Sequence, residues 1–358
     1  MPNDQDNEIT YRVAELLLRE RKTATDIWKQ INQEFPRANM TREKVYTRLA
    51  LALEKKFIRL HPPIEEELAR KVEKLFDCKP GSVRVVACPM PSSNEAVSHA
   101  AAEWALDLIK KIASNLGHPS VWVGLGPGSG TRDFVDRFSQ ALKSDQAAPK
   151  VNLVAITAGG PADQPQFAPV SYFNLFWQGN VGQRLGFFAE TLMPSRDFER
   201  LRAHPPLGIK EAFDAKKQLR LVVTSMGDRN DPHALFRVFQ DQSSHRPSQP
   251  KTRPKWWAEC VGDCQYRPFS QTAPIVEDPD DLRAVTLFEL DELVQMSTQT
   301  DKEVILIARP CGLCPPDHTR ARALLPILTS DKLRVFSKLV MDSGTARELL
   351  QMHPDPAP

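Results

Sequence analysis

The residues with the clearest chemical pattern lie between Val121 and Arg132, where an apolar run leads into a turn rich in glycine. A turn of this kind between a strand and a helix directs backbone N–H groups and the helix dipole toward an anion. It is not a Walker A motif, because no Gly-Lys-Ser/Thr follows, and it does not match the dinucleotide-binding pattern. A tight turn that needs glycine for positive φ is the alternative, but the density of glycines favours a ligand-binding loop. The residues predicted to contact the ligand are Gly124, Gly126, Gly128, Ser129, Gly130, Thr131 and Arg132.

The chain after Gly81 alternates short β-branched runs with longer amphipathic segments. This pattern is typical of a parallel sheet covered by helices. We therefore predict a doubly wound, mostly parallel α/β domain with the glycine loop at the carboxyl ends of its strands, where such sheets bind ligands. The predicted strands cover residues 83–87, 121–124, 152–156, 220–224, 303–308 and 338–341, and the predicted helices include 95–116 and 132–142.

Three short amphipathic helices are predicted in residues 1–62. The first covers 8–20, the segment from Thr23 to Asp26 can cap the second, and Thr41 can cap the third. Apolar residues at helical spacing are expected to face one another in a shared small core, so that this all-α domain has a helix-turn-helix arrangement. They are Val13, Leu16, Leu17, Ile27, Ile31, Phe35, Val45, Leu49 and Leu53.

The opposite face of the third helix carries side chains that hydrogen-bond phosphates and base edges in a major groove. They are Thr41, Arg42, Lys44, Tyr46, Thr47 and Arg48. Between Arg37 and Arg59 there are seven basic residues and two acidic ones, a local excess that phosphate neutralisation requires. A solvated helix surface is the plainer interpretation of each single residue. The β-type segment at 55–60 makes the domain winged-helix-like, and the combination favours binding of double-stranded DNA.

Residues 63–78 are predicted to form a linker helix, with Ile64, Leu68, Val72 and Leu75 at helical spacing. Its apolar stripe could equally pack against a second subunit. The expected organisation is therefore a DNA-binding domain at 1–62, this linker helix, an effector-binding domain at 79–352 and a disordered tail at 353–358.

Composition narrows the functional classes. Lys and Arg number 47 against 45 Asp and Glu, so DNA binding requires a local patch rather than a field of the whole chain. No signal peptide or membrane-length apolar run is evident, which predicts a soluble, cytoplasmic protein. Six cysteines are too few for a disulfide scaffold. A zinc site from the pairs Cys260/Cys264 and Cys311/Cys314 is the alternative that we do not favour, and no metal or cofactor is predicted.

The chain resembles the SorC family of sugar-responsive transcriptional regulators along nearly its full length. Residues 41–49 are similar to the family's recognition helix, 61–76 to its Pro-initiated linker helix, 124–131 to its sugar loop, and 339–350 to its closing signature. Cys260-Val261-Gly262-Asp263 resembles its Ala-Val-Gly-Asp turn.

This resemblance implies an effector domain with the fold of glucosamine-6-phosphate deaminase and ribose-5-phosphate isomerase. It also implies a sugar or sugar-phosphate effector, an operator DNA and a homo-oligomer, either a dimer or a tetramer. The effector site would include Asp263, Asp342 and a basic residue opening a late helix, here Arg320 where the family more often has Lys. The effector would act through the linker helix.

Two other functions are compatible with this fold. An isomerase or deaminase of the same fold needs a general base near the sugar carbons. The isomerase's acidic and lysine segments are missing, and the nearest candidates, Asp228 and Asp263, lack those surroundings. We therefore expect no enzyme activity. A protein-interaction module with a vestigial sugar pocket is the second alternative, against which the basic third helix argues.

Overall fold

The computed structural model describes residues 4–55, 57–58, 63–88, 94–117, 120–160, 164–176, 180–231, 234, 236, 254–310 and 318–353. Contacts divide the chain into two compact units, the N-terminal unit Met1–His61 and the C-terminal unit Pro62–Pro358. None of the helices in the described ranges is long and apolar enough to cross a membrane.

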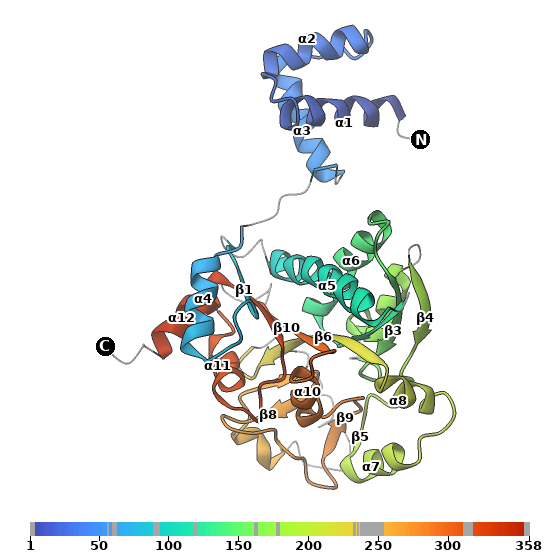
Figure 1. Ribbon diagram of the computed structural model, residues 1–358, viewed down its shortest axis with the longest axis vertical. Helices are drawn as coiled ribbons and strands as arrows, with labels where there is room; N and C mark the ends of the chain where they lie inside the picture. Colours follow the sequence, from blue (N-terminus) through green and yellow to red (C-terminus); the bar gives the residue numbers. More distant parts are fainter. Residues whose placement is uncertain are drawn as a thin grey trace. The chain divides into compact units, whose positions relative to one another are not determined.

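The N-terminal unit consists of α1 (Asp4–Leu18), α2 (Ala24–Glu34) and α3 (Arg42–Glu54), and Figure 1 shows the three helices packed together. Thr23 caps α2 by accepting a hydrogen bond from the backbone N–H of Asp26, and Thr41 caps α3 through the N–H of Lys44. These bonds satisfy donors that the first helical turn leaves unpaired. Apolar side chains from all three helices form the core that the sequence predicts, among them Val13, Leu16, Ile27, Ile31 and Val45.

The prediction that Leu53 faces this core is wrong. Leu53 is 38% exposed, whereas Ala52 is fully buried. A helix turns by about 100° per residue, so the residue seven positions after Val45 returns to within about 20° of it, and the eighth lies about 80° away. The four-residue spacing that linked Val45 to Leu53 therefore drifts off the buried face.

The β-type end expected after the third helix is not seen in the described residues. Lys55 caps the end of α3, and Phe57 and Ile58 donate backbone hydrogen bonds to the carbonyl of Ala52. These three residues lie in a turn and bends rather than in a strand. The other residues of 55–60 lie outside the described ranges.

The C-terminal unit is built around one large sheet. Its strands are β1 (Val83–Val86), β2 (Ser120–Leu125), β3 (Lys150–Ala155), β4 (Val181–Leu185), β6 (Leu219–Asp228), β7 (Gly262–Cys264), β8 (Arg267–Phe269), β10 (Glu303–Ala308) and β11 (Lys338–Asp342). The order β1-β11-β10-β6-β2-β3-β4 is parallel at every pairing, and β7 and β8 add an antiparallel hairpin to the end of β6. All six predicted strands and the mostly parallel, doubly wound sheet are confirmed.

The strand order reverses between β2 and β6. From β2 the chain moves outward through β3 to β4, and from β6 it moves the other way through β10 to β11. In open α/β sheets a crevice forms at such a point, because the connections leave the two strands on opposite sides. This reversal positions the site.

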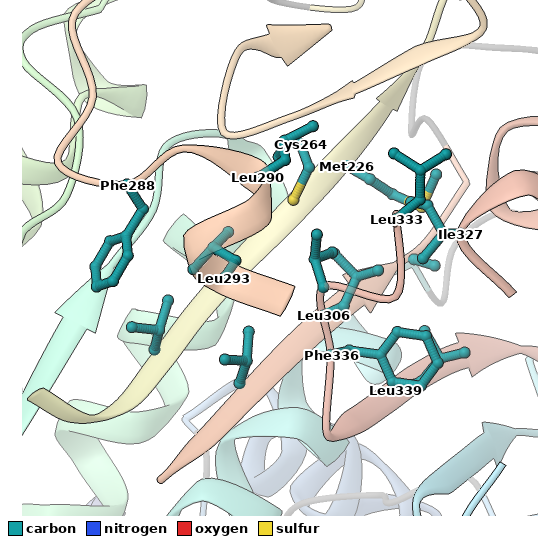
Figure 2. Close-up of a cluster of buried hydrophobic side chains, with 14 of the residues drawn as sticks. Met226, Cys264, Phe288, Leu290, Leu293, Leu306, Ile327, Leu333, Phe336 and Leu339 are labelled. Atoms are coloured by element: carbon teal, nitrogen blue, oxygen red, sulfur yellow. The ribbon is translucent and has the colours of Figure 1, made fainter. Parts of the chain in front are cut away.

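Helices cover both faces of the sheet (Figure 1). One face packs against α5 (Asn94–Leu116) and α6 (Ser129–Ser144), which contain both helices predicted here. The other packs against α4 (Glu66–Leu75), α8 (Lys210–Lys216), α10 (Leu290–Ser297), α11 (Ala321–Thr329) and α12 (Ser343–Met352). Figure 2 shows part of this second core, where Leu306 of β10 and Leu339 of β11 lie among Leu293, Ile327 and Phe336. A smaller antiparallel pair, β5 (Leu192–Pro194) and β9 (Leu282–Ala284), lies beside α7 (Ser195–Ala203).

The helix assigned to a linker by the sequence belongs to the C-terminal unit. α4 contacts β1 and α12, and its Val72 is fully buried in the main core. Glu65, just before α4, pairs with Arg347 of α12 at 2.9 Å, and the Phe76 ring lies 5.6 Å from that of His353. The apolar stripe is therefore largely covered within the chain: Val72 is buried and Leu68 and Leu75 pack against the core, whereas Ile64 is exposed. His353, which the prediction placed in the tail, makes this ring contact, and residues 354–358 lie outside the described residues.

Candidate functional site

A cavity of about 80 Å³ opens at the carboxyl ends of β2, β6 and β10, beside the point where the strand order reverses. Of the residues predicted from sequence, it brings together Gly128, Ser129, Gly130, Asp263 and Arg320. The main lining residues that were not predicted from the sequence are Ser225, Met226, Gly227, Asp231, Gln265, Tyr266 and Arg309. We call this cavity the switch-point pocket.

The amino-terminal end of α6 forms one wall of the switch-point pocket. Gly128 is the N-cap, with φ of 105°, a conformation that side chains with a Cβ rarely adopt. It makes no side-chain capping bond, so the first N–H groups of α6, at Ser129 and Gly130, have no partner within the helix. The Tyr172 hydroxyl lies 2.9 Å from the Gly128 carbonyl and holds the turn from behind. This wall presents the positive end of the helix dipole to the pocket.

Four residues of the glycine loop do not line the switch-point pocket. A Cβ on Gly124 would lie 2.9 Å from Ile156 Cγ2, and one on Gly126 would lie 2.3 Å from Thr224 Oγ1, so these glycines permit close packing between strands. Thr131 is buried and donates to the Pro127 carbonyl. The fourth, Arg132, points to the surface, 3.7 Å from Asp133.

Arg320 is the central cation of the pocket. It is only 6% exposed, and its Nη2 bonds to Asp231 Oδ2 at 2.6 Å while its Nε donates to the Arg309 carbonyl at 3.0 Å. The remaining Nη1 is buried and has no hydrogen-bond partner among the described residues. A guanidinium with two of its edges held in this way is rigid, so Nη1 presents a fixed donor to a ligand.

Asp342 does not line the pocket, although it was predicted to bind the effector. It caps α12, accepting from the backbone N–H of Thr345 at 2.8 Å and from its hydroxyl at 2.6 Å. The same hydroxyl oxygen lies 3.2 Å from the backbone N–H of Arg320. Asp342 therefore acts indirectly. It holds Thr345, and Thr345 holds the backbone at the start of α11.

A second guanidinium, that of Arg309, follows β10 directly and borders the same wall. Its Nη1 pairs with Asp133 of α6 at 2.8 Å, and its side chain is 10% exposed. Burial raises the pKa of Asp133, and the charge of Arg309 opposes that rise. Arg309 and Arg320 together give the pocket a positive side next to the α6 terminus.

In contrast to these two guanidinium groups, Asp263 supplies a carboxyl group to the pocket. It is buried, and its Oδ1 accepts from the backbone N–H of Tyr266 at 3.0 Å. Burial raises the pKa of Asp263 to about 7, despite that hydrogen bond and the nearby charge of Arg320. Near neutral pH this carboxyl can therefore donate as well as accept a hydrogen bond.

The hairpin between β7 and β8 carries two further side chains into the pocket. Its two-residue turn consists of Gln265 and Tyr266, with φ of 49° and 67°. Turns of this shape favour Asn-Gly, and each non-glycine residue there costs roughly 1–2 kcal/mol. The surrounding contacts hold it: Arg267, one residue on, pairs with the buried Glu277 through both Nη atoms at 2.5 and 2.6 Å.

The pocket therefore joins a wall of one helix terminus and two ion-paired guanidinium groups to a polar wall of Asp263 and Gln265. The α6 terminus, Arg309 and Arg320 can bind an anionic group, and Asp263 and Gln265 can hydrogen-bond uncharged polar groups beside it. The other candidate base, Asp228, accepts from the backbone N–H of Asn230 at 2.7 Å and does not line the cavity. The described residues hold no group of three or more His, Cys, Asp or Glu side chains placed for a metal ion. Cys311 and Cys314 lie outside those residues.

The predicted DNA-binding face of α3 is largely solvent-exposed. Arg42, Lys44, Tyr46 and Thr47 are exposed, while Thr41 serves as the N-cap. Arg48 differs, because it pairs with Asp6 of α1 at 2.5 Å and donates to Thr10 Oγ1 at 3.0 Å. The Lys44 ammonium also lies 2.9 Å from the Asn39 carbonyl. In the described part of the chain, three of the six predicted side chains, those of Arg42, Tyr46 and Thr47, therefore make no such structural contact.

Comparison with known proteins places the fold. No family model matches the sequence, and no curated protein matches it. The structure is similar to the full-length sorbitol operon regulator SorC from Klebsiella pneumoniae, with a TM-score of 0.62 and 16% identity over 97% of this chain and 100% of that one.

Two further solved structures also match, each with a TM-score of 0.55. Each match covers 79% of this chain and 98% of the chain of the solved structure. They are a probable sor operon regulator from Shigella flexneri, 16% identical, and a DeoR family transcriptional regulator from Listeria monocytogenes, 15% identical. The fold expected from the resemblance, a helix-turn-helix unit and a doubly wound α/β unit, is confirmed.

Proposed function

We propose that this chain is a SorC-type transcriptional regulator of the cytoplasm, which binds operator DNA through α3 and responds to a sugar or sugar phosphate in the switch-point pocket. The observation that carries the proposal is the pocket itself. It lies where an α/β sheet of this order binds ligands, and it combines a free helix terminus with the buried Arg320. The exposed basic side chains of α3 supply the DNA-binding surface.

A regulatory effect requires that the effector bind more tightly to one DNA-binding state of the protein than to the other. Helix-turn-helix proteins read two half-sites as dimers, and we include a homodimer or a tetramer in the proposal. Light scattering of the purified chain measures this directly, and a monomer at micromolar concentration would contradict it.

Binding of the DNA that lies upstream of the encoding gene tests the function. We expect fluorescence anisotropy to detect binding that changes when a sugar phosphate is added. Arg42→Ala and Lys44→Ala should weaken binding and each lower the salt slope by about one. Arg19→Ala, which removes a charge from an exposed site just after α1, is the matched control and should have little effect.

Two results would contradict parts of this proposal. Equal weakening by the control and by the α3 variants would show that α3 is not the DNA-contacting helix. Operator binding that no sugar or sugar phosphate changes, although the pocket binds one, would overturn the effector mechanism.

Catalysis is not part of the proposed function. In the pocket, Asp231 is paired with Arg320, and Asp263, whose Oδ1 accepts from the hairpin backbone, is assigned to ligand binding rather than to proton transfer. Incubation of a sugar phosphate with stoichiometric protein, followed by analysis of the sugar, should return it unchanged.

A further inference from the structure

The side chain of Gln265 is held in one orientation at the tip of the β7–β8 hairpin. Its Nε2 donates to the Phe288 carbonyl at 2.8 Å. Because that partner is a carbonyl and can only accept, the nitrogen of the amide must face it, and the oxygen must face the other way. Gln265 is 1% exposed, and its Oε1 is buried without a hydrogen-bond partner among the described residues. Gln265 lines the switch-point pocket, so its Oε1 is a fixed, unpaired acceptor at this cavity.

A complementary group lies on the same cavity. Arg320 Nη1 is a buried donor that also has no partner in the described part of the chain. Buried polar groups are seldom left unpaired, because desolvation is then not repaid. One unpaired acceptor and one unpaired donor on the same cavity match a ligand that carries an acceptor for the arginine and a donor for the glutamine.

The backbone that presents Gln265 is itself unusual. Gln265 and Tyr266 both have positive φ, although neither is a glycine or asparagine, and both side chains are buried on the pocket. Unfavourable backbone conformations of this kind are concentrated at functional sites. A turn that only had to connect β7 to β8 would be more stable with Asn-Gly. The residue types therefore point to a role for these side chains in the pocket.

We propose that Gln265 is a specificity-determining residue, whose Oε1 accepts a hydrogen bond from a hydroxyl group of the ligand. The anionic group of the same ligand binds Arg320 and the α6 terminus. The ligand is then a hydroxylated organic anion, and Gln265 distinguishes it from a simple anion. This inference rests on the proposed function, because it concerns the same effector.

Calorimetric titration of the full-length protein tests the assignment. The ligands are a panel of sugar monophosphates beginning with glucose-6-phosphate and ribose-5-phosphate, together with inorganic phosphate as an anion without hydroxyl carbons. Gln265→Met keeps the length of the side chain and removes the amide. Gln295→Met, at an exposed position on α10, is the matched control.

We expect the wild type to bind at least one sugar phosphate more tightly than inorganic phosphate. Gln265→Met should weaken that sugar phosphate about tenfold and leave inorganic phosphate unchanged. If circular dichroism shows that Gln265→Met does not fold, Gln265→Asn replaces it. Asparagine tolerates positive φ, and its shorter side chain withdraws the acceptor, so the same selective loss is expected.

Each other outcome has a distinct meaning. If the variants keep the wild-type preference for the sugar phosphate, the role of Gln265 is overturned and the proposed function stands. Equal losses for sugar phosphate and inorganic phosphate also overturn it, because the substitution then disturbs the whole pocket. If the wild type prefers no sugar phosphate to inorganic phosphate, the proposed effector class fails and the assignment of Gln265 fails with it.

Discussion

Arginine side chains have opposite environments in the two units of this chain. On α3, Arg42 is exposed, whereas in the switch-point pocket Arg320 is buried and paired with the equally buried Asp231. Exposed charges contribute little to stability and remain available to a partner, while removal of one member of a buried pair leaves the other without compensation. Loss of ligand binding in a pocket variant therefore has to be separated from loss of folding, whereas variants of exposed α3 side chains such as Arg42 carry no such ambiguity.

The largest loss of stability is expected for Arg320→Ala. It leaves the Asp231 carboxylate buried without its cation, so we expect the free energy of unfolding to fall by about 3–5 kcal/mol. Urea unfolding measures it. Arg132→Ala is the control, because this side chain is 42% exposed and its contact with Asp133 is long, and its effect should stay within about 0.5 kcal/mol. Similar losses for both variants would contradict the distinction between buried and exposed arginines.

Asp263→Asn should change how stability depends on pH. The folded-state pKa of Asp263, about 7, lies above its unfolded value near 3.8. Between these values the folded state holds the extra proton, so the contribution of Asp263 falls as the pH rises, by at most about 1.4 kcal/mol per pH unit. Asparagine cannot ionise and keeps the hydrogen bond to Tyr266.

The measurement is the difference in unfolding free energy between variant and wild type across this range. The variant should gain on the wild type as the pH rises from about 4 to about 7, and the difference should then stay level. A difference that does not change with pH would show that Asp263 titrates normally in the folded protein.

The smallest effect is expected for the two arginines of α3. Arg48→Ala removes the partly exposed pair with Asp6 and the hydrogen bond to Thr10, and should lower the unfolding free energy by about 0.2–1 kcal/mol. Arg42→Ala removes the same charge from the same helix with a change near zero. Chemical denaturation of both variants checks this, and a larger loss for Arg42 would contradict the structural role of Arg48.

The larger elements could be predicted because their patterns are long. Each of the six predicted strands belongs to the parallel sheet, where burial on both faces requires continuous apolar runs. Strands β5, β7, β8 and β9 have three residues each and were missed, because so few residues carry no period. Leu53 was misplaced because a four-residue spacing drifts around the helix.

The site was only partly predictable. Glycine has two different uses in one loop: Gly128 needs its positive φ, whereas Gly124 needs only the missing Cβ to let Ile156 approach. The sequence does not distinguish them. Arg309 could have been found, since it directly follows a predicted strand. No sequence signal marks Gln265, because Gln-Tyr is not a recognised turn pair. The proposed role of Gln265 also depends on how β7 pairs with β8.

The packing of α4 against α12 has a consequence for protein engineering. The C-terminal unit begins and ends on neighbouring helices, tied by the pairs Glu65–Arg347 and Phe76–His353. Domains whose ends lie close together tolerate insertion into a host loop and circular permutation. We therefore expect residues 63–353 to tolerate insertion into a surface loop of a reporter enzyme, with the switch-point pocket included.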